Sequence, residues 1–170
     1  PSGDTYLLAF VDPGADLDGT PLASIGSSDI LVAKADSQGA ILWSDVYGSQ
    51  QSEYPQQIGL GPDGAPFVSG TFSGVIDFGV GPVVAAGALS TFVASFDASG
   101  VANWSRGIPT FAAAEIGLDG SLLLAGSFQG NLDLGGPAAD PAHAARPRDE
   151  RAVPSRRRRA HPRGAAPQRL

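Results

Sequence analysis

The sequence predicts an all-β protein built from a repeated unit of four short strands. Glycine and proline are frequent, with 23 and 14 residues in a chain of 170, and only 16% of the residues are charged. Both residues punctuate strands and interrupt helices, and no segment keeps the i, i+3, i+4, i+7 apolar spacing of an amphipathic helix. The chain also repeats itself, because its two tryptophans, Trp43 and Trp104, each follow an Asp-x-x-Gly segment at the same spacing.

The repeat has two parts. Residues 21–44 align with residues 82–105 at a constant separation of 61, and eight of the 24 positions are identical. Residues 63–79 align with residues 119–135 at a separation of 56, with seven of 17 identical. The difference of five residues (61 minus 56) lies in the segment "YGSQQSEYPQQ" (47–57), which is longer in the first copy.

These alignments divide the chain into four segments. We expect the end of a preceding unit at residues 1–20 and two repeats at residues 21–81 and 82–136. A tail of different composition follows at residues 137–170.

Four strands are expected in each repeat. In the first copy they span residues 29–36, 40–47, 56–60 and 65–72. Val, Ile, Phe and Trp fill these segments, as a half-buried pleated surface favours. Asp-Gly and Ser-Gly pairs separate them, and glycine supplies the positive φ of a hairpin turn.

A period near 60 residues with four short strands fits the blade of a β-propeller. Strand content excludes a helical repeat, a β-helix has a shorter period, and tandem β-sandwiches need more strands in each unit. Closed propellers use about 4–8 blades, so we expect an incomplete arc of two to three blades that needs further blades to close.

The segments "SDILVAKADSQGAILW" (28–43) and "STFVASFDASGVANW" (90–104) are each followed by "DG…G.F.G.[IL]D[FL]G". This pattern resembles the SBBP-type β-propeller repeats of large bacterial secreted or surface proteins, over residues 1–137. The resemblance implies a propeller fold and an extracytoplasmic location, and it supplies no shared catalytic residues. Trp43 and Trp104 would then occupy one position in successive blades, filling the wedge between neighbouring sheets.

The sequence contains few motifs that point to catalysis. "GLGPDG" (59–64) has dinucleotide-loop spacing, but Pro62 and the strand that follows predict a β-turn, because such a loop must lead into a helix. Asn103 opens the glycosylation sequon "NWS" within a predicted strand, which we attribute to chance. Residues 1–140 lack His and Cys, the commonest general base and thiol nucleophile. We therefore predict no catalytic residue, no cofactor and no enzyme activity.

Three aspartates in "DPGADLDG", Asp12, Asp16 and Asp18, could offer oxygen ligands to calcium. Their spacing differs from that of an EF-hand loop, and Asp16 is the repeat counterpart of Asp77 and Asp133. A turn carboxylate that accepts nearby backbone N–H groups explains them without a metal. We assign no metal site, and a calcium-stabilised adhesive array remains an alternative.

The net charge of −6 combines two unlike parts. Residues 1–140 carry two basic residues and fifteen carboxylates, a net charge of −13. Residues 141–170 carry nine arginines and two carboxylates, a net charge of +7, and the two parts sum to −6. The repeat pattern stops after Gly136, and "RRRR" (156–159) could be a basic arm for nucleic acid or an anionic surface. We favour a frameshifted, disordered segment, because Ala, Pro and Arg are what GC-rich DNA yields in a wrong frame.

The sequence thus predicts a fragment of a bacterial extracytoplasmic β-propeller repeat protein that acts as a scaffold or binding module. Its ligand would be a protein or glycan, with no nucleic acid bound by residues 1–136. No membrane span is expected, because no apolar run approaches about 18 residues. The alternatives are a carbohydrate-active propeller enzyme whose catalytic carboxylates lie outside this chain, and the calcium-stabilised array.

Overall fold

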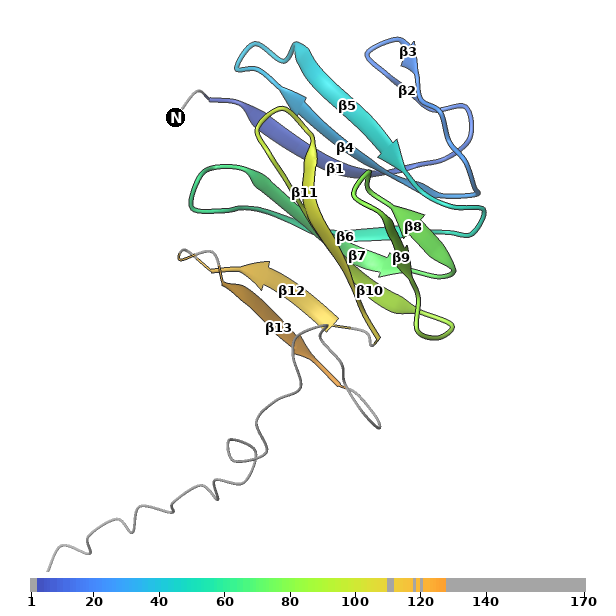
Figure 1. Cartoon of the computed structure of the whole chain (residues 1–170). Helices are drawn as coiled ribbons and strands as arrows, with labels where there is room; N and C mark the ends of the chain where they lie inside the picture. Colours follow the sequence, from blue (N-terminus) through green and yellow to red (C-terminus); the bar gives the residue numbers. More distant parts are fainter. Residues whose placement is uncertain (1–2, 110–111, 118, 120, 128–170) are drawn as a thin grey trace, which may run out of the picture. The chain divides into compact units, whose positions relative to one another are not determined.

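The computed structural model describes residues 3–109, 112–117, 119 and 121–127. All secondary-structure elements assigned in these residues are β-strands, so the all-β prediction is confirmed (Figure 1). None of them belongs to a helix long and apolar enough to cross a membrane. The predictions for the tail at 137–170 and for Asp133 lie outside the described residues.

The first sheet has three antiparallel strands in the order β1-β4-β5. These are β1 (Thr5–Val11), β4 (Asp29–Ala35) and β5 (Ile41–Tyr47). A short hairpin of β2 (Asp16–Leu17) and β3 (Thr20–Pro21) lies between β1 and β4 in the chain.

The second sheet has four antiparallel strands in the order β11-β10-β7-β6. Its strands are β6 (Tyr54–Leu60), β7 (Pro66–Phe72), β10 (Ser90–Phe96) and β11 (Ala102–Ile108).

Two further hairpins complete the described residues. One joins β8 (Val75–Asp77) to β9 (Pro82–Val84), and the other joins β12 (Ala112–Ile116) to β13 (Leu122–Gly126). The register of the first, with Asp77 opposite Pro82, repeats that of β2 and β3, where Asp16 lies opposite Pro21.

The hydrogen-bonded sheets are offset by half a unit from the repeat of the sequence. β6 and β7 come from residues 21–81, yet they share a sheet with β10 and β11 from residues 82–136. Ser90 to Ser95 pair with Phe72 to Phe67, which joins the two repeats by a backbone ladder. β4 and β5 pair instead with β1, which precedes the first repeat.

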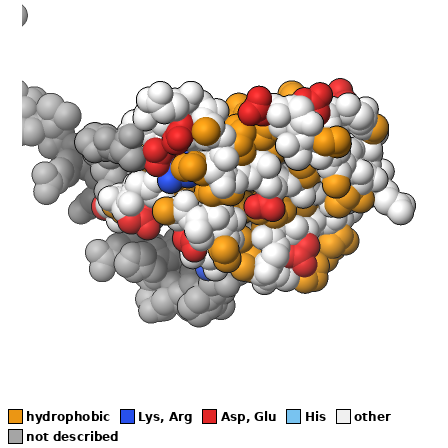
Figure 2. Space-filling view, turned by 90° about the horizontal axis from the view of Figure 1, so that it is seen from above, with side chains coloured by type: hydrophobic (Ala, Val, Ile, Leu, Met, Phe, Trp, Pro, Cys, Tyr) orange, Lys and Arg blue, Asp and Glu red, His pale blue; other side chains and the backbone are white. Residues whose placement is uncertain are grey.

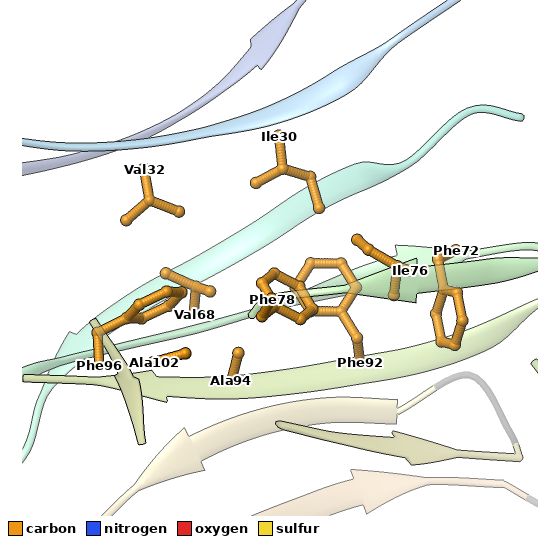
Figure 3. Close-up of a cluster of buried hydrophobic side chains, with 10 residues drawn as sticks. All are labelled: Ile30, Val32, Val68, Phe72, Ile76, Phe78, Phe92, Ala94, Phe96 and Ala102. Atoms are coloured by element: carbon orange, nitrogen blue, oxygen red, sulfur yellow. The ribbon is translucent and has the colours of Figure 1, made fainter. Parts of the chain in front are cut away.

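The main core lies between the first two sheets (Figure 3). Ile30 and Val32 of β4 lie on one side, and Phe92 and Phe96 of β10 lie on the other. Phe78, which follows β8, lies among these aromatic rings, with its ring centroid 5.2 Å from that of Phe92 and 6.2 Å from that of Phe96. The β8–β9 hairpin thus places one large side chain in this core.

The central strand β7 of the second sheet is buried on both faces. All seven residues of β7 are buried, although neighbouring side chains on a strand point to opposite faces. On the face away from the main core, Phe67 and Val93 pack with Ile108 and with Ala114 of β12. The second sheet therefore lies between the first sheet and β12.

Candidate functional site

The loop between β5 and β6, residues 48–53, is where the first repeat differs most from the second. It contains the extra residues of the first repeat, and it joins the first sheet to the second. The loop lies tightly against residues before β4, because a Cβ added to Gly26 would lie 2.5 Å from the carbonyl oxygen of Gln51. Ser28 forms a bridge with Ser52, and the Glu53 N–H donates to the Ser28 carbonyl at 2.9 Å.

Asp29, the first residue of β4, is fully buried beneath this loop. Its Oδ2 accepts hydrogen bonds from the N–H groups of Ile25, at 2.5 Å, and Gly26, at 3.2 Å. Its Oδ1 is also buried and has no hydrogen-bond partner. Gly48 lies so close to this carboxyl group that any side chain there would collide with it. The site therefore requires glycine at position 48.

Glu53 is the second fully buried carboxyl group of the site. Its Oε2 accepts the Ser49 N–H at 3.0 Å and its Oε1 accepts the Ser49 hydroxyl at 2.6 Å. Burial raises the pKa of Glu53, and the adjacent Asp29 carboxyl raises it further, while the Ser49 hydrogen bonds oppose this shift. The environment thus favours the protonated form of Glu53 more than water does for an exposed glutamate.

The second repeat carries neither carboxyl group at this place. Ser90 occupies the position of Asp29, and its Oγ accepts the Ala86 N–H at 3.0 Å, as Asp29 accepts the Ile25 N–H. The shorter loop of the second repeat contains no counterpart of Glu53. In the second repeat a single serine hydroxyl accepts the N–H of this turn, and the carboxyl pair is specific to the first repeat.

Full burial decides what this pair can do chemically. A catalytic acid or base has to come within hydrogen-bond reach of a substrate, and neither Asp29 nor Glu53 is exposed to one. Glu53 closes the β5–β6 loop through Ser49, and Asp29 fixes the segment before β4 against which this loop lies. Sequence reasoning missed it, although the extra residues of the first repeat and the change from Asp29 to Ser90 both marked the place.

An exposed aromatic pair lies beside the buried carboxyl groups. Phe10 of β1 and Tyr54 of β6 are 57% and 47% exposed, and their ring centroids are 6.0 Å apart in an edge-to-face arrangement. Ser28 donates to Asp12 at 2.8 Å, two residues beyond Phe10, so polar groups border the rings. The pair joins the first sheet to the second at the surface, and Thr71 replaces Phe10 in the next repeat.

The two tryptophans occupy equivalent places. Trp43 of β5 lies opposite Lys34, and Trp104 of β11 lies opposite Ser95, the residue that matches Lys34 at a separation of 61. Both are half-buried. Trp43 packs against the main core and Trp104 against the cluster around Phe67.

The candidate calcium ligands do not form a common site. Asp16 accepts the Gly19 N–H at 2.9 Å, which closes the turn between β2 and β3, and Asp12 accepts the Ser28 hydroxyl. Asp18 adopts a positive φ of 52° in the same turn. Among the described residues, no group of three or more carboxylate or imidazole side chains is arranged to hold a metal ion.

Two other sequence motifs lie where they were expected. Residues 61–64 form a turn between β6 and β7, closed by the Gly64 N–H bonded to the Gly61 carbonyl at 2.9 Å, so the β-turn prediction is confirmed. Asn103 lies within β11 and is exposed.

Comparison with known proteins gives no assignment. No protein-family model matches this chain, and no curated protein matches it closely enough to count as a relative.

Proposed function

We propose that this chain is a section of an SBBP-type β-propeller repeat protein that acts as an extracytoplasmic scaffold or binding module. The observation that supports it is the sheet β6-β7-β10-β11, in which four antiparallel strands follow one another in chain order. Such a sheet is the form of a propeller blade. The strands of the first sheet and of the β12–β13 hairpin occupy positions equivalent to parts of it, at separations of 61 and 56 residues.

An array lengthened with further copies of residues 21–81 tests the propeller. A closed propeller would appear as a monomeric disc with a central channel by electron microscopy. Its free energy of unfolding would rise sharply at the copy number that closes the ring, because closure removes exposed edges. An open array whose stability grows evenly with each added copy would contradict the proposal.

The binding role is assigned to the surface formed by Phe10 and Tyr54. Exposed aromatic side chains bordered by polar groups are typical of interaction surfaces, because a ring buries a large area while losing little side-chain freedom. Tyr54 lies in the segment that is longer in the first repeat, and Thr71 stands in the next unit where Phe10 stands here, so a purely architectural position would not require this pair.

A double variant, Phe10→Ser with Tyr54→Ser, tests this role. Val75→Ser with Val84→Ser is the matched control, since these valines are 46% and 66% exposed and also lie opposite one another, on β8 and β9. The probes are a printed array of bacterial oligosaccharides and a peptide array, which separate a glycan ligand from a protein ligand. Binding lost only in the first variant supports the assignment, and equal binding by both variants, or no binding by the parent chain, contradicts it.

The extracytoplasmic location rests on the resemblance alone. Fractionation of cells that produce the full-length protein, with cytoplasmic and surface markers followed in parallel, tests it directly.

A further inference from the structure

The loop between β5 and β6 is held in place by polar contacts. Its sequence, "GSQQSE" (48–53), contains no apolar side chain that could be buried. Besides the backbone bond from Glu53 to Ser28, the hydroxyl oxygens of Ser27 and Ser52 lie 2.8 Å apart. A segment held in this way can open locally while the strands on either side stay folded.

The side chains around this loop are short of hydrogen atoms. Ser49 Oγ accepts the Gln51 N–H at 3.0 Å, and it faces two acceptors, Gln51 Oε1 at 3.0 Å and Glu53 Oε1 at 2.6 Å. A hydroxyl group has one hydrogen, so it serves only one of them. Asp29 Oδ1 is buried without a hydrogen-bond partner among the described residues, and turning the Gln51 amide would not change this. A proton on Glu53 adds a donor to this group, whereas ionised Glu53 adds only acceptors.

The charges around Glu53 also favour a proton there. Burial raises the pKa of Glu53, and the Asp29 carboxyl group, within hydrogen-bonding reach, raises it further. The two basic residues of the described chain lie elsewhere, Lys34 toward the other end of β4 and Arg106 on β11, the edge strand of the second sheet opposite β6. Ionised Glu53 would thus face another carboxyl group rather than a cation. The other ionisable side chains on the neighbouring segments carry no positive charge, and they are Asp12 after β1, Asp45 and Tyr47 of β5, and Tyr54 of β6.

The two carboxyl groups lie next to the residues that form the exposed aromatic pair. Tyr54 directly follows Glu53 in the chain. Asp29 lies opposite Val11 in the β1–β4 ladder, and Val11 is the neighbour of Phe10. The carboxyl pair therefore lies at the junction of the two strands whose rings meet edge to face.

We propose that Asp29 and Glu53 form a proton-operated latch on the β5–β6 loop, which keeps Tyr54 paired with Phe10 at acidic pH and releases it as the pH rises. The proton binds the closed loop more tightly than the open loop, so it shifts the population toward the closed form. When the loop opens, both carboxyl groups reach water, and Glu53 gives up its proton to the solvent. Ligand binding at the aromatic pair is then stronger at acidic than at neutral pH, a consequence that rests on the binding role proposed above.

The direction of the effect follows from proton binding to the two forms. The closed loop keeps the proton of Glu53 up to the raised pKa, whereas the open loop releases it near the usual pKa of 4.5. Between these two values the opening equilibrium rises by up to about tenfold per pH unit, and above the higher value it stays constant.

Amide hydrogen exchange, followed by NMR on the full chain from about pH 4 to about pH 8, measures the opening without a ligand. Protection of the Ser49 and Glu53 N–H groups, corrected for the intrinsic effect of pH, should fall by up to about tenfold per unit across this window. Amides at the centres of β7 and β10 report global unfolding and should keep their higher protection. Protection of the loop that is independent of pH, or that falls only together with that of β7 and β10, overturns the latch.

Two variants test the role of the carboxyl pair. Glu53→Gln is neutral and carries a donor, as the protonated acid does, so it should keep the protection of the loop constant. Asp29→Asn keeps an oxygen for the Ile25 N–H and offers a donor to ionised Glu53, so it should also abolish the fall. Glu115→Gln, which changes an exposed carboxyl group on β12, is the matched control and should behave like the parent chain. A fall that persists in both Glu53→Gln and Asp29→Asn overturns the proposal.

The link to the aromatic pair has its own measurements. Nuclear Overhauser effects between the rings of Phe10 and Tyr54 should weaken across the same pH window in the parent chain and persist in Glu53→Gln. The oligosaccharide and peptide arrays, probed at about pH 5 and about pH 7.5, should give the stronger signal at the lower pH in the parent chain and equal signals in Glu53→Gln. Ring contacts that persist while the loop opens overturn the link. If both NMR changes occur and the parent chain binds neither array, the latch is supported and the binding role is contradicted.

Discussion

At the scale of single residues, Asp29 and Glu53 show how one insertion changes the chemistry of a turn. In the second repeat the hydroxyl of Ser90 accepts one N–H, and no charge is buried. In the first repeat the longer loop brings a second carboxyl group onto Asp29, and both are fully buried. Two buried carboxyl groups avoid the cost of an isolated charge most simply when one of them keeps its proton.

Glu53 should make the folded state less stable as the pH rises. Its pKa is raised above the usual 4.5, so between that pH and the raised value the folded chain binds more protons than the unfolded chain. The free energy of unfolding then falls with rising pH across this window and levels off above it. Glu53→Gln should flatten this part of the profile, measured by urea unfolding at a series of pH values. Glu115→Gln, which removes an exposed carboxyl group from β12, should leave it in place.

Asp29 should tolerate serine better than alanine. Serine is the residue of the second repeat and keeps an acceptor for the part-buried Ile25 N–H, whereas alanine removes that acceptor. The difference in the free energy of unfolding should be about 1–3 kcal/mol in favour of Asp29→Ser. Equal stability of the two variants would show that this hydrogen bond does not stabilise the segment before β4.

At the scale of elements, the turn of β10–β11 should be more sensitive than the turn of β6–β7. Gly100→Ala and Gly64→Ala both place a side chain at positive φ, which costs roughly 1–2 kcal/mol in either turn. Only the first also meets the ring of Trp43, so it should cost about 1–3 kcal/mol more. Chemical unfolding of the two variants gives the difference, and equal values would mean that Trp43 moves away without loss.

The positions of the strands could be predicted from the sequence, but their pairing could not. The turn residues and apolar runs placed four strands within about two residues of β4, β5, β6 and β7. A ladder between β7 and β10 depends on the path of the chain over 17 intervening residues, 73–89, and local pattern does not encode that path. The carboxyl pair was missed for a similar reason, since Asp29 and Glu53 meet only when the loop folds back.

At the scale of the whole molecule, acidic charge dominates the described surface. Figure 2 shows acidic side chains spread among apolar ones, with basic groups scarce. Lys34 forms an ion pair with Asp4 at 2.9 Å, and residues 1–140 have a net charge of −13. Copies of such a surface repel one another at low ionic strength.

Salt should therefore weaken the electrostatic repulsion between copies of the chain. Raising sodium chloride from low to physiological and then to molar concentration shortens the Debye length from about 30 to 3 Å, which screens the repulsion between copies. The weight-average mass from sedimentation should rise along this series at constant protein concentration. A mass that falls with salt would show that attraction between opposite charges outweighs this repulsion.

The offset between sheet and repeat has a consequence for how such an array changes during evolution. Unequal recombination that adds or removes one whole repeat adds or removes the second half of one sheet together with the first half of the next. The halves that remain come from equivalent positions, as β6–β7 and β10–β11 do, so they can rejoin with the same ladder. Unequal recombination can thus lengthen or shorten the array without leaving an unpaired strand in its interior.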